Sequence, residues 1–379
     1  MDNSWTNTSL NGNTTTVSQD HFLCGSFIEN IIEKWLRNLG YGIVFIPGVL
    51  GNLLAILAFN NQPKMRTVPN LFITNLAIAD FVVSLINVPL VAVHAHLTFW
   101  PFGSFMCKLI PFVQGVSLAA SVGTMIAIAA DRFKVIVHYE LPKMSISHAK
   151  AVLVVIWILS CAVPAPLLKY SDTIEVQCKG ERLTKCVEMW SDPMHLRAYT
   201  MVLFMVLYCL PVVLTSLLYG KIAHTFRNLP TAQKVSHQAQ HRIVRMFVIV
   251  VTLFAVCWLP YHVVFLYLDY AQPQQTDLLI KIVLFCQWLI YANSACNPVI
   301  YTVFNTNYRR QFLRMLRLPH RRVYENSSST DGRNLSLRSR NRKQRLGKRN
   351  SCPSRTDAVI GNPEDMAVHT RPKSRGLTM

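Results

Sequence analysis

The side chains most able to do chemistry in this sequence are polar groups placed inside or at the ends of strongly apolar segments. Asp80 lies in the middle of one such segment, NLAIAD, where an uncompensated carboxylate would be costly. It is therefore either a polar anchor that bonds a neighbouring helix or a ligand for a hard cation such as sodium. The oxygen-bearing residues expected to join it are Asn52, Ser121, Asn293, Ser294 and Asn297.

A charged pair, Asp131-Arg132, ends another apolar segment, and Cys107 lies near the other end of that segment. Along a helix, Asp131 would lie about 36 Å from Cys107, which is enough to cross a membrane. One helix would thus carry a cysteine at one surface and an ion pair at the other. The pair could also be ordinary interfacial charge.

Cys107 and three others of the ten cysteines fall in segments expected on one side of the membrane. Disulfides persist there if that side is extracellular. The four cysteines are Cys24, Cys107, Cys178 and Cys186, and they allow three pairings. No cysteine and histidine spacing resembles a zinc site. The sequence also contains no Walker, Gly-x-Ser-x-Gly or His-Glu-x-x-His motif, so it gives no support for an enzyme.

The segments that carry these residues are too apolar for a soluble protein. Of the 379 residues 51% are apolar and 15% charged, against about 25% charged in soluble domains. Windows of about 20 apolar residues occur at roughly 40–60, 68–94, 104–137, 149–168, 196–226, 241–267 and 278–304. The sequence therefore predicts an all-α membrane protein, a bundle of seven transmembrane helices.

The charges orient this bundle. The formal net charge is +19, and with the N-terminus outside, 29 of the 38 lysines and arginines fall in inner loops, inner helix ends and the tail. This asymmetry and anionic lipid at the inner surface account for the basicity, so no nucleic-acid partner is needed. We expect a multi-pass protein of the plasma membrane with an extracellular N-terminus.

The expected organisation has four parts. Residues 1–38 are polar and carry glycosylation sequons at Asn7 and Asn13, and residues 39–305 form the bundle. Residues 306–318 read as an amphipathic helix on the inner leaflet, and residues 319–379 as a disordered basic cytoplasmic tail. The tail contains a serine and threonine cluster at 327–330, where phosphorylation would add negative charge to a basic segment; the alternative is ordinary serine-rich disorder.

Short motifs follow one another in order along the seven apolar segments. They are Gly51-Asn52, Asn75-Leu76-Ala77-x-Ala79-Asp80, Cys107, Asp131-Arg132-Phe133, Trp157, Pro211, Tyr219, Phe254-x-x-Cys257-Trp258-x-Pro260 and Asn297-Pro298-x-x-Tyr301. Together they resemble the rhodopsin-like G-protein-coupled receptors over residues 40–318. The resemblance implies a cell-surface receptor that activates heterotrimeric G proteins by opening the inner face of its bundle.

The same resemblance implies roles for individual residues. It pairs Cys107 with Cys186 in a disulfide, and it makes the Asp80 cluster a candidate allosteric sodium site, with no other cofactor. The residues that match the family's activation and G-protein-coupling positions are Val122, Asp131, Arg132, Pro211, Tyr219, Phe254, Trp258, Asn297, Pro298 and Tyr301. Two positions depart from the pattern: Phe133 replaces the usual tyrosine, and Gln240 stands where an acid often does, so no salt bridge from Arg132 to the sixth helix is expected.

Absences and local similarities narrow the ligand class. Gln114 stands where amine receptors carry an aspartate, and Tyr291 where opsins carry the retinal-binding lysine. Residues 66–68, 108–114 and 186–190 are similar to RFamide-type receptors, those for pyroglutamylated RFamide peptide and neuropeptide FF, and then to neuropeptide Y receptors. This implies a neuropeptide receptor for C-terminally amidated peptides.

A ligand that ends in Arg-Phe-amide needs an acid, an apolar pocket and an amide partner. Asp269, near the outer end of the sixth segment, matches the acid that pairs with the ligand arginine, and Gln114 could bind the terminal amide. The other expected ligand-binding residues are Glu188, His262, Phe265, Gln287 and Tyr291. Glu188 could instead be a solvated loop charge, and Gln114 a helix–helix hydrogen bond.

Two other functions compete with a peptide receptor. A seven-helix receptor for a lipid would not need the net acidic outer surface that the sequence predicts. A transporter or channel should show charged residues along a path or internal repeats, whereas only Asp80 lies deep in a segment.

Overall fold

The computed structural model describes residues 30–316 except 98, 179–180, 229–237 and 275, and within this part it contains seven helices long and apolar enough to cross a membrane. The elements are α2 (Ile31–Ile46), the π-helical turn η1 (Pro47–Gly51), α3 (Asn52–Asn61), the 3-10 turn η2 (Pro63–Met65), α4 (Val68–His94), α5 (Gly103–Val137), α6 (Ile146–Ala162), α7 (Ala165–Tyr170), β1 (Ser171–Cys178), β2 (Glu181–Glu188), α8 (Pro193–Phe204), the π-helical turn η3 (Met205–Cys209), α9 (Leu210–Asn228), α11 (Gln238–Ala271), α12 (Asp277–Phe304) and α13 (Thr306–Met315). The predicted seven-helix bundle is confirmed.

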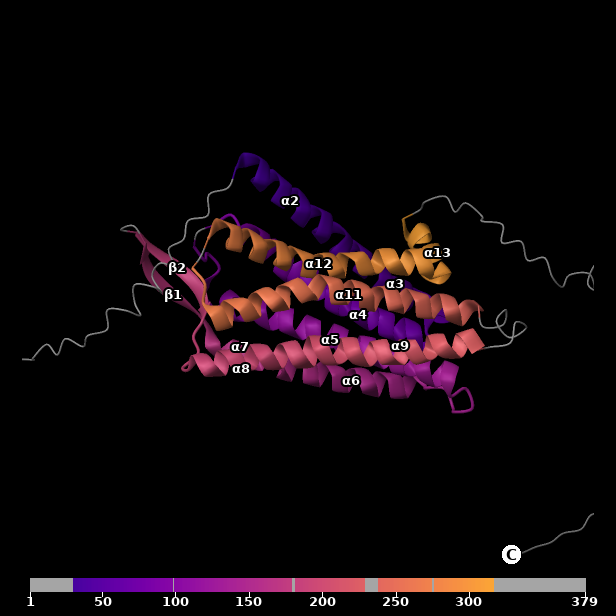
Figure 1. Cartoon of the computed structure of the whole chain (residues 1–379). Coiled ribbons are helices and arrows are strands. Elements are labelled where there is room, and N and C mark those ends of the chain that lie inside the picture. Colours follow the sequence, from indigo (N-terminus) through magenta and orange to yellow (C-terminus); the bar gives the residue numbers. More distant parts are fainter. Residues whose placement is uncertain (1–29, 98, 179–180, 229–237, 275, 317–379) are drawn as a thin grey trace, which may run out of the picture. The chain divides into compact units, whose positions relative to one another are not determined.

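The helices are arranged around α5, which packs against α4, α6 and α9 and is the most deeply buried of the seven spans. Figure 1 shows α5 in the interior of the bundle, and α11 contacts it on one side while α12 packs against α11 and α4. Large apolar side chains such as Trp35, Ile158 and Leu217 point outward and are more than 60% exposed. An outer surface of this kind suits hydrocarbon and would be unfavourable in water.

Prolines lie at two kinds of place in the helices. Pro47 opens η1, and Pro211 is the second residue after the end of η3, so a wide π turn lies next to each of them. Pro89, Pro260 and Pro298 lie inside continuous helices. Proline has no backbone N–H, so each of these prolines leaves a carbonyl of the preceding turn without its helical hydrogen bond. The helices tolerate this loss because neighbouring helices surround them.

The first span begins at Ile31, inside the segment that the sequence analysis assigned to the polar N-terminus. The Asn30 backbone N–H donates to Glu33 Oε2 at 3.2 Å and starts the helix. Charged residues in this first part of α2 lower its mean hydropathy, which is why a hydropathy window misses it. Figure 1 shows α2 inclined to α12, and Glu33 in this part of α2 pairs with Lys281 Nζ of α12 at 2.7 Å.

A two-stranded antiparallel sheet, β1–β2, lies at one end of the bundle, with Ser171 paired to Glu188 and Cys178 to Glu181. The all-α prediction did not include it. We call this end of the bundle the hairpin end, and the opposite end, where α13 follows α12, the α13 end.

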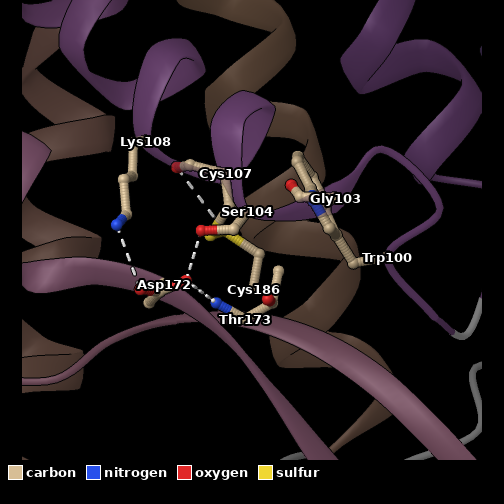
Figure 2. The surroundings of a disulfide bond; sticks show 8 residues. All are labelled: Trp100, Gly103, Ser104, Cys107, Lys108, Asp172, Thr173 and Cys186. Carbon is tan, nitrogen blue, oxygen red and sulfur yellow. Dashed lines mark hydrogen bonds and ion pairs between the residues drawn. A yellow bond between two sulfur atoms is a disulfide. The ribbon is translucent and has the colours of Figure 1, made fainter.

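The hairpin is attached to the start of α5 by a disulfide and an ion pair (Figure 2). Cys107 and Cys186 form the predicted disulfide, with their Cα atoms 5.6 Å apart. Asp172 accepts a hydrogen bond from Ser104 and pairs with Lys108 Nζ at 3.0 Å. These contacts, with the Ser104 hydrogen bond foremost, lower the pKa of Asp172 to about 2. The hairpin is therefore held to the bundle at neutral pH by both covalent and ionic contacts.

Helix α13 lies within the predicted amphipathic segment. The Asn305 side chain accepts from the backbone N–H of Asn307 and caps its start, and Tyr308 and Phe312 bury one face against the bundle. Residues 317–318, the predicted tail, the sequons at Asn7 and Asn13, and Cys24 lie outside the described residues.

Candidate functional site

Two carboxylates meet at the hairpin end. Glu188 ends β2 and accepts a hydrogen bond from Trp190 Nε1 at 2.8 Å, and Trp190 in turn stacks on Tyr170. The residue is open to solvent on one side, but the surrounding protein partly desolvates the carboxylate and raises its pKa, and the nearby negative charge of Asp269 raises it further. The predicted acids Glu188 and Asp269 are therefore neighbours that repel each other.

Two side chains of α8 hold Asp269 in place, and the sequence analysis did not predict these contacts. Thr200 Oγ1 donates to Asp269 Oδ2 at 2.6 Å, and Arg197 Nε donates to the Asp269 backbone carbonyl at 3.0 Å. The Arg197 guanidinium also lies over the Tyr270 ring, 5.6 Å from its centroid. Residues 197 and 200 are three positions apart and therefore share one face of α8. This spacing was the signal in the sequence that both side chains could contact the same neighbouring residue. Asp269 is half-buried, with a cation of the protein beside it.

Aromatic rings gather below the two acids. Tyr261 lies within electrostatic range of both carboxylates and stacks on Phe265, with ring centroids 4.2 Å apart. His262 comes next on α11 and is 6% exposed, and its Nε2 makes no hydrogen bond to the described residues. The rings around the His262 ring, at centroid distances of 5.4–6.0 Å, are Phe204, Tyr208, Trp258 and Tyr261.

The predicted amide group forms a separate network between three helices. Asn87 Nδ2 donates to Gln114 Oε1 at 3.2 Å and to the Ile110 carbonyl at 2.9 Å, which joins α4 to α5. Tyr291 on α12 interacts with both Asn87 and Gln287. Gln114 thus makes the helix–helix hydrogen bond that the sequence analysis gave as its alternative. Asn87 was not predicted.

Tyr291 differs from the expectation that it lines a ligand cavity. It is 1% exposed and lies in the interior of the helix bundle. A ring of this volume is enclosed because α12 turns it toward α2 and α11, where it lies near Tyr41 and Tyr261. The described conformation therefore gives Tyr291 a supporting position behind the amides.

A buried polar cluster lies in the middle of the bundle around Asp80, which is 2% exposed. Asn297 Nδ2 donates to Asp80 Oδ2 at 2.7 Å, and Asn52 Nδ2 donates to the Ser294 carbonyl at 3.2 Å. The amide oxygens of Asn52, Asn293 and Asn297 are buried and accept no hydrogen bond in the described part of the chain. Ser121 and Ser294 are buried with them. One carboxylate and several unsatisfied oxygens fit a small hard cation.

At the α13 end Arg132 connects two helices. Its guanidinium bonds Asp131 on its own helix, and Nη1 donates to Gln240 Oε1 on α11 at 3.0 Å. The substitution of the usual acid by Gln240 therefore removes a charge and keeps a contact between α5 and α11. The hydroxyls of Tyr219 and Tyr301 are buried close to this region and make no hydrogen bond to the described residues.

The residues that match the family's packing positions are buried between the two ends. Val122 and Phe254 belong to one apolar core, and Pro211 is buried on α9. Phe254 contacts Trp258, with ring centroids 6.0 Å apart. This row of contacts connects the aromatic rings below Glu188 and Asp269 with the interior of the bundle.

Comparison with protein families matches residues 51–301 to the seven-transmembrane receptors of the rhodopsin family. The matched range begins and ends on the first and last motif residues of the sequence analysis, Gly51 and Tyr301. The resemblance predicted from those motifs is confirmed.

Individual relatives are receptors for peptides. A QRFP-like peptide receptor from Branchiostoma floridae is 33% identical over 298 residues, covering 75% of this chain and 78% of that protein. Neuropeptide FF receptor 1 from Homo sapiens is 32% identical over 293 residues, covering 72% and 68%. Galanin receptor type 1 from Homo sapiens is 33% identical over 288 residues, covering 74% and 81%.

Proposed function

The chain belongs to the rhodopsin family of seven-transmembrane receptors, and from that premise we propose that its ligand is a peptide ending in Arg-Phe-amide, bound at the hairpin end. It is a peptide receptor of the plasma membrane that signals through heterotrimeric G proteins, and it is not an enzyme. The observation that carries the ligand proposal is the pair of carboxylates, Glu188 and Asp269, next to a cluster of aromatic rings.

In this proposal the hairpin end and the N-terminus face the outside of the cell. The excess of lysine and arginine at the α13 end and in the tail supports this orientation. The disulfide between Cys107 and Cys186 supports it as well, because disulfides persist in an oxidising compartment.

Each part of the peptide terminus has a matching group. The guanidinium would pair with Asp269 and Glu188, and two acids for one cation would relieve their mutual repulsion. The phenylalanine ring would pack among Phe265, Tyr261 and the rings around His262. The terminal amide would exchange hydrogen bonds with Gln114, which is now bonded to Asn87.

Signalling in this proposal is a shift between two arrangements of the helices. A peptide that binds the open arrangement more tightly raises its population. Opening of the α13 end would break the Arg132–Gln240 hydrogen bond and give the buried hydroxyls of Tyr219 and Tyr301 access to partners. Sodium at Asp80 would stabilise the closed arrangement. Receptor kinases and an arrestin would act on the serine cluster of the tail.

The test of the ligand proposal is a double-mutant cycle between Asp269 and the peptide arginine. Asp269→Asn should weaken an Arg-Phe-amide peptide by about ten- to a hundredfold, since the carboxylate is half-buried. It should weaken the citrulline analogue far less, because that peptide carries no charge. Displacement binding on cell membranes measures both losses.

Glu175→Gln is the matched control, since Glu175 is an exposed acid of the same hairpin. It should leave both affinities unchanged. Equal losses for the two peptides in Asp269→Asn would mean that Asp269 supports Thr200 and α8 and does not contact the arginine.

A further inference from the structure

A groove of about 380 Å³ lies between the first part of α2 and the first part of α12, at the hairpin end and apart from the acidic pair. We propose that it binds one glycerophospholipid of the adjoining leaflet. The groove is built from residues at least 240 positions apart in the sequence, Leu36, Arg37 and Tyr41 on one helix and Lys281, Leu284 and Trp288 on the other. Figure 1 shows the two helices diverging toward this end.

The walls of the groove are mainly apolar. Leu36 and Leu284 line it, and Phe285 stacks on Trp288 with ring centroids 6.0 Å apart. The surface of α2 beside it is apolar too, since Trp35, Leu39 and Ile43 are each more than half exposed. A surface of this kind lies in the membrane, so the groove adjoins acyl chains.

The polar groups of the groove favour an anion. Lys281 Nζ pairs with Glu33 Oε1 at 2.7 Å, and Arg37 Nη2 lies 2.6 Å from His96 Nδ1. Both basic residues thus have partners in the protein, and the lining holds these two basic residues and one acid. A cationic peptide would be repelled here, whereas the phosphate of a phospholipid would be attracted.

Two buried polar atoms give this site a second, independent feature. Trp288 and Tyr41 line the groove, and the buried Trp288 Nε1 and Tyr41 hydroxyl beside it make no hydrogen bond within the described part of the chain. The indole nitrogen lies 3.2 Å from the position a Cβ would take on Gly40, so a larger residue there would push the indole away from α2 by a few tenths of an ångström. An ester or phosphate oxygen would satisfy the indole donor, which carries no acceptor of its own.

The combination selects the class of lipid. A sterol has the apolar body and lacks the anion, and inorganic phosphate has the anion and lacks the chains. Tryptophan, tyrosine, lysine and arginine together are typical of the depth at which glycerophospholipid headgroups meet their acyl chains. A glycerophospholipid satisfies the apolar wall, the basic pair and the indole donor at once.

Native mass spectrometry of the purified full-length receptor in detergent tests the proposal with three probes. Dioleoylphosphatidylcholine should bind with one saturable site. Dioleoylglycerol, which lacks the phosphate, and glycerophosphocholine, which lacks the chains, should each bind at least about tenfold more weakly. Equal binding of dioleoylglycerol, or of cholesterol, would overturn the assignment of the phosphate to this groove.

Variants then locate the site. Trp288→Phe keeps the ring and removes the N–H, and Lys281→Gln removes one cation, so each should weaken dioleoylphosphatidylcholine by about three- to tenfold. Trp35→Phe is the matched control, because Trp35 lies on α2 outside the groove and should leave binding unchanged. Similar losses in Trp35→Phe and Trp288→Phe would contradict the proposal.

A photoreactive phosphatidylcholine with a diazirine in one acyl chain gives a result that needs no variant. Cross-linking to the wild-type receptor followed by peptide mapping should label residues within 33–41 and 281–288. Labelling confined to other helices would overturn the site even if the variants failed to fold.

Discussion

At the scale of single residues, the binding site depends on how its charges are compensated. Glu188 and Asp269 are close enough to repel each other, and the raised pKa of Glu188 reflects partial desolvation first and this repulsion second. The negative charge of Asp269 is stabilised by a hydrogen bond from the Thr200 hydroxyl and by the nearby positive charge of Arg197. A ligand arginine placed between the two acids would offset the repulsion that Asp269 exerts on Glu188.

The raised pKa of Glu188 predicts that the affinity of an Arg-Phe-amide peptide falls as the pH is lowered. A cation favours the ionised form of Glu188, so the attraction is complete above the raised pKa and is lost as the pH falls through it. Binding measured between about pH 7.5 and about pH 5 should show this loss. Glu188→Gln should flatten the profile and Glu175→Gln should not. A profile in Glu188→Gln that stays parallel to that of the wild type would contradict the prediction.

At the scale of elements, one specific contact joins neighbouring elements at each end of the bundle. The Arg132–Gln240 hydrogen bond joins α5 to α11 at the α13 end, and the disulfide joins β2 to α5 at the hairpin end. No salt bridge from Arg132 to the sixth span was expected, and the structure shows a hydrogen bond to the neutral amide oxygen of Gln240 in its place. A neutral acceptor stabilises the closed arrangement less than a carboxylate would.

Substitutions of Gln240 should therefore change basal signalling in opposite directions. Gln240→Ala removes a hydrogen bond worth about 1 kcal/mol and should raise basal G-protein activation up to about fivefold. Gln240→Glu adds a charge opposite Arg132 and should lower it. Nucleotide exchange on the G protein, normalised to receptor at the cell surface, measures both. Gln238→Ala is the control, because Gln238 is an exposed glutamine of the same helix. An equal rise of basal activation in Gln238→Ala would contradict the role assigned to Gln240.

At the scale of the whole molecule, the Asp80 cluster connects the first, second, third and seventh spans. Asn52, Ser121 and Asn297 come from three different helices and are buried around one carboxylate. The amide oxygens of Asn52 and Asn297 accept no hydrogen bond from the residues that the structure describes, which is costly unless a cation or a rearrangement satisfies them. Such a cluster can favour one global arrangement over another, because only some arrangements bring all its oxygens together.

Sodium should consequently lower agonist affinity. In about 100 mM sodium chloride, agonist should bind the wild-type receptor about fivefold more weakly than in choline chloride of equal ionic strength. Asp80→Asn should abolish the difference, since the amide carries no charge for the ion. Ser84→Ala changes another buried polar residue of α4 and should retain it. A wild-type affinity that does not respond to sodium would rule out this site.

The sequence by itself determined the seven spans, the motif residues and the disulfide partners implied by the family. These properties depend on local hydropathy and on residues at fixed positions along one helix, so they can be read without coordinates. It also gave Asp269, Glu188 and Gln114 as candidates, and missed Arg197, Thr200 and Asn87, which hold two of them in place.

Only the tertiary structure decided which side chains meet across helices. The rotation and tilt of α8 place Thr200 against Asp269, the position of α4 gives Gln114 a partner in Asn87, and the divergence of α2 from α12 opens a groove between Leu36 and Trp288. The early start of α2 and the β1–β2 hairpin were likewise settled by contacts. Helix rotation and tilt follow from packing among all seven helices, and no local pattern in the sequence encodes that packing.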